Sequence, residues 1–112
     1  MQPLYIKDLS AFLARFGNFV DGELRHIEIV SPTTFEITLA GQDANRGHDW
    51  ITVKFELSEV SEAALLENSD YSYVDMSDGI DIEVVDYEFT LSIKNSTFFV
   101  ASAALKYEEG KF

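Results

Sequence analysis

Apolar and polar residues alternate strictly along three consecutive segments in the last third of the chain. A repeat of two residues is typical of strands that bury one face, and polar breaks at Asp86 and Asn95 separate the segments as hairpin turns do. We therefore expect three antiparallel strands, at residues 80–84, 87–93 and 99–107. On the last of these strands the alternation places the following residues on one face: Phe99, Ala101, Ala103, Leu105 and Tyr107.

Helical spacing replaces strand spacing near the N-terminus. Apolar residues at positions i, i+3, i+4 and i+7 share one helix face, and here they are Leu9, Phe12, Leu13 and Phe16. Asp8 can cap the first turn, and Gly17 stands where helices commonly end in a left-handed residue. Because so short a helix is stable only when packed, we expect its apolar face to lie on the sheet.

Three more strands are expected before the middle of the chain, at residues 23–30, 35–39 and 51–57. Pro32 ends the first of them, because proline cannot donate to a strand ladder. The polar loop 41–49 separates the other two, which we expect to pair as a hairpin. Residues 61–67 favour a helix by propensity, and residues 71–76 favour a ragged strand or an ordered loop.

Together these elements predict a single α+β domain over residues 1–112. One N-terminal helix packs on a mainly antiparallel sheet of about six strands. A length of 112 residues suits one ordinary domain, and a hydrophobic share of 46% is enough for a packed core. The chain contains no cysteine, which excludes disulfides and thiolate chemistry.

The chain is strongly acidic, with 20 acidic and 8 basic residues and a net charge of −12. Such a charge repels phosphate and anionic lipid, so we expect binding neither to nucleic acid nor to a membrane surface. A basic protein partner would instead be attracted and its association accelerated. The alternative interpretation is that the acidity only keeps a small protein soluble.

The expected location is the cytoplasm. Residues 1–8 contain no basic segment followed by an apolar run, so they do not resemble a signal peptide. No stretch approaches the about 20 apolar residues that a membrane-spanning helix needs.

Side chains suited to metal binding or catalysis do not form a recognisable motif. The loop from Asp43 to Asp49 places oxygen atoms at alternate positions, but the twelfth position is Lys54, where a calcium loop has glutamate. His26 and His48 are the two histidines, so without cysteine a zinc site would also require carboxylate ligands. We therefore expect no catalytic residue, no bound cofactor and no metal, and we interpret the protein as not an enzyme.

Five residues are candidates for contact with a partner. The carboxylates Asp81 and Glu83 lie on the strand face opposite the apolar positions, where the alternative is a merely solvated face. Tyr71 and Tyr73 occupy the irregular middle of the chain. Phe98 is out of phase with the last strand, so either that strand is buried on both sides or a small apolar patch is exposed.

The segment LARFGNFVDGEL at residues 13–24, followed by a strand-like IEI at residues 27–29, resembles the opening of small bacterial proteins of the immunity type. Those proteins begin with a short helix and a Phe-x-Asp-Ser/Gly-Glu motif before a strand, and the likeness covers about a quarter of the chain. The resemblance implies a compact α+β protein that binds and neutralises a partner without catalysis.

The leading hypothesis is a non-enzymatic, acidic interaction protein, with inhibition of a basic partner in the manner of an immunity protein as its particular form. The main alternative is a small-ligand or carbohydrate-binding module, with Trp50 and the region of Tyr71 and Tyr73 lining a groove. A carboxylate-dependent enzyme is a further alternative. A self-associating structural protein, paired into a homo-oligomer through an exposed sheet edge, is the last.

Overall fold

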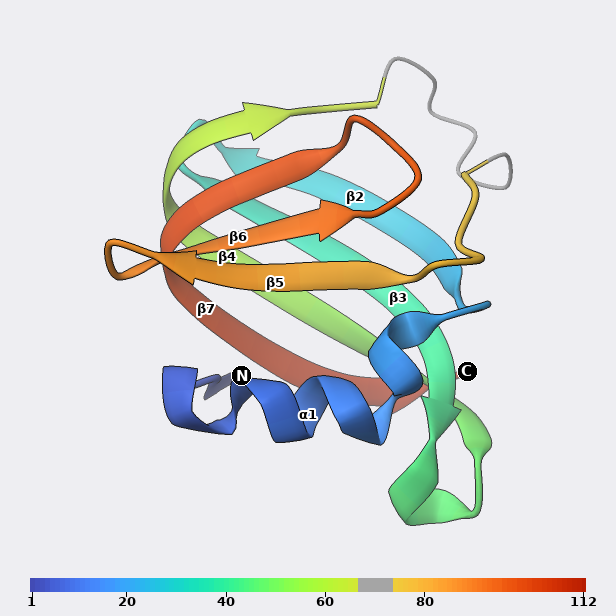
Figure 1. The fold of residues 1–112 in the computed structure, drawn as a ribbon. Helices are drawn as coiled ribbons and strands as arrows, with labels where there is room; N and C mark the ends of the chain where they lie inside the picture. Colours follow the sequence, from blue (N-terminus) through green and yellow to red (C-terminus); the bar gives the residue numbers. More distant parts are fainter. Residues whose placement is uncertain (67–73) are drawn as a thin grey trace.

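The computed structural model describes residues 1–66 and 74–112, and these form one curled antiparallel sheet with a short helix across one end (Figure 1). No helix in this described part is long and apolar enough to cross a membrane. The elements in chain order are β1 (Gln2–Pro3), a 3₁₀ turn (Ile6–Asp8), α1 (Leu9–Arg15), a turn (Gly17–Phe19), β2 (Glu23–Ser31), β3 (Thr34–Asp43), a 3₁₀ turn (Ala44–Arg46), β4 (Asp49–Ala64), β5 (Ile80–Val85), β6 (Glu88–Ile93) and β7 (Phe99–Lys111).

The sheet has seven strands in the order β2-β3-β4-β7-β6-β5, and every pairing is antiparallel. Strand β7 lies at the centre, because it pairs with β4 along one side and with β6 and then β1 along the other. The predicted sheet-dominated α+β fold is confirmed, and the expected six strands become seven through the two-residue β1. The predicted hairpin of residues 35–39 with 51–57 is also confirmed, as β3 and β4.

The predicted alternation along residues 99–107 is wrong over its first half. Val100 lies opposite the buried Leu91, whereas Ala103 is exposed, so the core side begins as Phe98, Val100 and Ser102. The core-facing positions then shift by one residue, so that the next buried position after Ser102 is Leu105. The partner strand β4 changes phase at the same place, where Glu59 adopts a left-handed φ of 55°. Just beyond it, between Val60 and Glu62, the pairing is irregular, because β4 has one residue more than β7 over this step.

The helix predicted at residues 61–67 is also wrong for the part that the structure describes. Strand β4 continues to Ala64, where Ala63 pairs with Val100 and Ala64 pairs with Phe99. Alanine and glutamate favour helices in isolation, but pairing with a central strand outweighs a propensity of a few tenths of a kcal/mol per residue.

Helix α1 packs its aromatic side chains onto one half of the concave sheet face. The Phe12 ring lies 6.0 Å from Phe55 and 4.6 Å from Tyr107, measured between centroids. Asp8 precedes the helix as predicted, although its side chain makes no capping hydrogen bond. The expected packing of the helix on the sheet is therefore confirmed at Phe55 and Tyr107.

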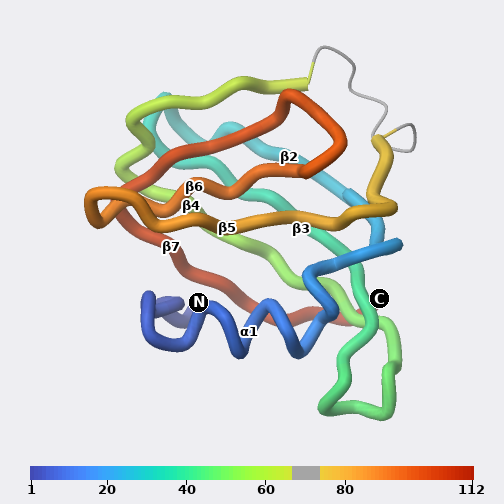
Figure 2. The backbone as a smooth tube through the Cα atoms, in the orientation of Figure 1, coloured from blue at the N-terminus to red at the C-terminus, as the bar shows by residue number. Residues whose placement is uncertain are grey.

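A left-handed turn after α1 connects the helix to both edges of the sheet (Figure 2). Gly17, Asn18 and Phe19 have φ values of 57°, 55° and 58°, of which only the glycine adopts its value without strain. The Phe19 side chain is fully buried and stacks on Phe16 at 5.0 Å. Beyond the turn, the amide of Asp21, just before the edge strand β2, donates to the carbonyl of Met76, just before the other edge strand, β5. The turn thus joins the two edges.

Candidate functional site

A row of three glutamates crosses three neighbouring strands on the outer face of the sheet. Glu28 of β2 lies directly opposite Glu36 of β3, which lies directly opposite Glu56 of β4, and Lys106 follows on β7. We call Glu28, Glu36 and Glu56 the glutamate row. Side chains directly opposite each other on adjacent strands have Cβ atoms about 5 Å apart, so like charges there repel and destabilise the fold.

Glu36, the central member of the glutamate row, has a raised pKa. Partial burial raises the pKa of Glu36 above its ordinary value, the carboxylates of Glu28 and Glu56 add to the rise, and Lys54 opposes it. A carboxyl group with a raised pKa in the folded state favours folding most at low pH, and this contribution falls as the pH rises through the folded pKa. The charged form of Glu36 is therefore a source of instability at neutral pH.

Replacing Glu36 with glutamine is expected to increase the free energy of unfolding at pH 7 by about 0.2–1 kcal/mol, because it removes the central charge of the row. The gain should vanish below about pH 4, where Glu36 is protonated in both states. Urea unfolding at the two pH values measures this difference. Glu108→Gln is the control, since Glu108 lies on the same face but 3.9 Å from Lys54. An equal gain from both variants would contradict a specific repulsion within the row.

The predicted contact residues Asp81 and Glu83 lie on the outer face of β5, opposite in direction to the buried Ile80 and Ile82. Glu83 is exposed and Asp81 is partly exposed. The strand order places them at the other side of the sheet from the glutamate row. The fold therefore directs both groups of carboxylates outward but does not bring them together.

The aromatic candidates have different outcomes. Phe98 is 1% exposed and belongs to the core, so as folded it offers no exposed apolar patch to a partner. The strand after it is buried on both sides only at Val100 and Ala101, because Phe99 is partly exposed and Ala103 is exposed. The Phe98 ring lies in the half of the sheet formed with β6, whereas α1 contacts Phe55 and Tyr107. Tyr71 and Tyr73 lie outside the described residues.

An ion-pair cluster at one end of the sheet joins α1, the β3–β4 loop and β7. Arg15 donates two hydrogen bonds to Asp43, from Nε at 2.8 Å and from Nη2 at 2.6 Å, and two more to Glu109. Arg46 forms ion pairs with the same two carboxylates, at 3.2 Å from Asp43 and at 3.1 Å from Glu109, to which it donates a hydrogen bond. We call Arg15, Asp43, Arg46 and Glu109 the arginine cluster.

Asp43 is the buried member of the arginine cluster, with a side-chain exposure of 0%. Hydrogen bonds from Arg15 hold the pKa of Asp43 below its ordinary value, although burial alone would raise it. The same contacts raise the pKa of Arg15. Oδ1 of Asp43 also accepts a hydrogen bond from the backbone amide of Asn45, which fixes the first turn of the loop. The cluster therefore stabilises the position of the β3–β4 loop.

The sequence contains one signal for this cluster, although no motif marks it. The apolar alternation of Phe35, Ile37 and Leu39 extends through Gly41 to Asp43, which places a carboxylate on the core side of a strand. A charged side chain at such a position requires a buried partner of opposite charge. Nothing in the sequence identified that partner as Arg15, which is 28 residues away along the chain.

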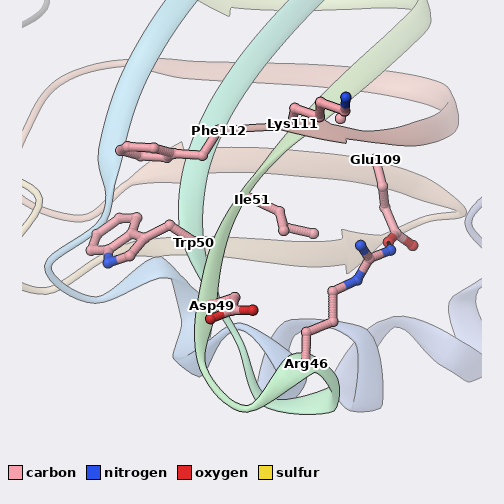
Figure 3. A pocket seen from close by; sticks show the side chains of 8 residues that line it. Arg46, Asp49, Trp50, Ile51, Glu109, Lys111 and Phe112 are labelled. Carbon is pink, nitrogen blue, oxygen red and sulfur yellow. Dashed lines mark hydrogen bonds and ion pairs between the residues drawn. The ribbon is translucent and has the colours of Figure 1, made fainter.

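Beside the arginine cluster, a groove of about 440 Å³ lies between the β3–β4 loop and the last residues of β7. We call it the Trp50 groove, and it is lined by Arg46, Asp49, Trp50, Ile51, Glu109, Gly110, Lys111 and Phe112. Figure 3 shows Trp50 and Phe112 together on one side, Arg46 and Glu109 together on the other, and Ile51 between them. Trp50 lines this groove, with Phe112 beside it at 5.4 Å between ring centroids, whereas the part of the expected groove assigned to Tyr71 and Tyr73 falls outside the described residues.

Metal ligands do not gather at any of these places, since no group of three or more His, Asp or Glu side chains within residues 1–66 and 74–112 could hold an ion. Comparison of the chain with protein-family models, with curated proteins and with solved structures gives no match. The fold and its sites define an acidic, single-sheet α+β protein with a charged outer face and an aromatic groove. The function proposed below is therefore argued from the geometry of these sites.

Proposed function

We propose that this protein is a non-enzymatic interaction protein that binds a basic partner protein through the outer face of its sheet. The glutamate row carries the proposal. Its carboxylates lie directly opposite one another, and partial burial together with these neighbours raises the pKa of Glu36, an arrangement that destabilises the protein when it is alone. Lysine and arginine side chains of a partner would relieve this repulsion, and proteins keep such locally unfavourable arrangements chiefly where they function.

The overall charge of the protein, like the glutamate row, favours binding of a basic partner. A net charge of −12 attracts a basic protein over long range and increases its association rate, most strongly at low ionic strength. The resemblance of residues 13–29 to immunity proteins supports a particular form of this function, the neutralisation of a basic toxin domain by covering it. Asp81 and Glu83 extend the acidic outer face on the far edge of the sheet.

The glutamate row should be required for partner capture. A variant with Glu28, Glu36 and Glu56 replaced by glutamine is compared with wild type in pull-downs from native lysate, followed by salt elution from about 50 to 500 mM. The control variant carries Asp8→Asn, Asp78→Asn and Asp86→Asn, three exposed positions that change the net charge equally.

We expect wild type and the control variant to retain the same basic protein and release it as salt rises, whereas the row variant loses it. The retained protein is identified by mass spectrometry, and its affinity is measured again with purified components. Equal capture by all three proteins, or capture that salt does not weaken, would contradict the proposal.

A further inference from the structure

We infer that the Trp50 groove is a binding site for a neutral saccharide, which is a function separate from the proposed contact with a basic partner. The groove differs from the rest of this acidic chain in its charge balance. Arg46 and Glu109 neutralise each other at 3.1 Å, and Lys111 is balanced by Asp49 at the opposite end of the groove (Figure 3). A groove without net charge, on a protein with a charge of −12, favours neither an anionic nor a cationic ligand.

Several polar atoms around the groove are available to a ligand. Within the described part of the chain, the carboxylate of Asp49 and the ammonium of Lys111 make no hydrogen bond or ion pair, and Nη1 of Arg46 has no acceptor. Together they offer both donors and acceptors. A hydroxyl group donates and accepts at once, so a ligand with several adjacent hydroxyl groups can satisfy both kinds of atom.

An aromatic surface completes the site. Trp50 is 36% exposed and Phe112 is 55% exposed, and the guanidinium of Arg25 lies 4.3 Å from the centre of the Phe112 ring. Glu23 holds Arg25 in place at 3.0 Å. The C–H-rich face of a sugar ring is apolar and packs on such rings, while its hydroxyl groups reach the polar atoms at the edge.

The donor on the opposite side of the groove is already held in position before a ligand arrives. Arg46 is 56% exposed, yet its guanidinium is held by the buried Asp43 and by Glu109. A donor that is fixed in advance loses little conformational entropy on binding, which favours the ligand. Trp50 also lines a second hollow of about 250 Å³, together with residues that include Arg15, Gln42 and His48. Because Trp50 lines both hollows, we choose ligands of two sugar units as probes.

The intrinsic fluorescence of the protein reports this site directly, because Trp50 is the single tryptophan of the chain. We expect a saturable change in the emission of the full chain with at least one of cellobiose, maltose, lactose and N,N′-diacetylchitobiose, with a Kd of about 0.1–1 mM, as suits an open groove. Glucose 6-phosphate and spermine serve as anionic and cationic probes. Failure of all four disaccharides at about 20 mM, or tighter binding of either charged probe, would overturn the inference.

Two variants and one control assign the binding to the groove. Asp49→Asn should weaken the disaccharide about tenfold, since it replaces a charged acceptor by a neutral one. Trp50→Ala, measured by calorimetry, should abolish binding. Tyr87→Ala removes an aromatic ring that is 86% exposed on the β5–β6 turn and should leave the affinity unchanged. Equal losses in Asp49→Asn and Tyr87→Ala would overturn the assignment. The glutamate-row variant leaves these residues intact, so failure of one proposal does not decide the other.

Discussion

Replacing Asp43 with asparagine is expected to lower the free energy of unfolding at pH 7 by about 3–5 kcal/mol, because it removes the buried carboxylate that Arg15 and Arg46 share and leaves Glu109 as their remaining charged partner. The carboxylate is 0% exposed and receives both Nε and Nη2 of Arg15. Asparagine has a similar volume, so the loss measures the charge and its hydrogen bonds rather than a cavity. Urea unfolding, followed by circular dichroism, gives the free energy of both proteins.

The same variant should change how stability depends on acid. Because the folded pKa of Asp43 is lowered, its contribution is fully present above the unfolded value of about 3.9 and is lost as the pH falls through the folded pKa. The difference between wild type and Asp43→Asn should therefore narrow progressively below about pH 4. A constant difference down to pH 2 would contradict this assignment of the pKa.

A second ion pair provides the control for Asp43→Asn. Glu23 and Arg25 are 3.0 Å apart on the surface, with side-chain exposures of 48% and 35%, so Glu23→Gln should cost less than about 1 kcal/mol. In a double-mutant cycle, Arg15→Met combined with Asp43→Asn should be less destabilising than the sum of the two single changes. Equal costs for Asp43→Asn and Glu23→Gln would contradict the central role of the arginine cluster.

Replacing Gly79 with alanine is expected to lower the free energy of unfolding by about 3 kcal/mol or more, because two unfavourable terms combine. Gly79 has a φ of +70°, which an L-residue adopts only with strain. An added Cβ would also overlap the carbonyl oxygen of Asn18 and lie 2.8 Å from the amide nitrogen of Val20. These contacts are with backbone atoms of the segment that joins the two sheet edges, so they cannot be relieved by a rotating side chain.

Gly47 offers a matched control for the Gly79 prediction. Its φ of +63° is similar, but a Cβ there would meet no atom within 4 Å. Gly47→Ala should therefore cost only the backbone term, about 1–2 kcal/mol. Thermal and urea unfolding of the two variants separate the contribution of backbone strain from that of the tight contact. Equal losses would mean that the left-handed turn can move away from residue 79.

Local patterns were sufficient to place most of the secondary structure. The alternation at residues 80–84, 87–93 and 51–57 and the helical spacing from Leu9 to Phe16 each depend on neighbours within one element, and all of these appear in the fold. The same patterns failed at residues 61–64 and at the beginning of β7. There the conformation depends on a partner strand, and the left-handed residue Glu59 in β4 lies where the buried face of β7 also changes phase.

The candidate sites were predictable only in part. Exposed carboxylates on β5 and the surface role of Trp50 follow from alternation and composition. The glutamate row depends on strand order and register, which place Glu28, Glu36 and Glu56 side by side although up to 28 positions separate them. The groove required the last residues of β7 to lie next to the β3–β4 loop, a contact between distant segments.

Charge and periodicity are properties of the chain alone, so they were enough to predict an acidic, sheet-dominated domain with an N-terminal amphipathic helix. Which charged side chains lie close together depends instead on the tertiary structure. It buried Phe98, joined Arg15 to Asp43 across the domain, and left the glutamates of three strands opposite one another. Pairing energies between distant residues depend on geometry at a scale of a few ångströms, and only the folded chain fixes that geometry.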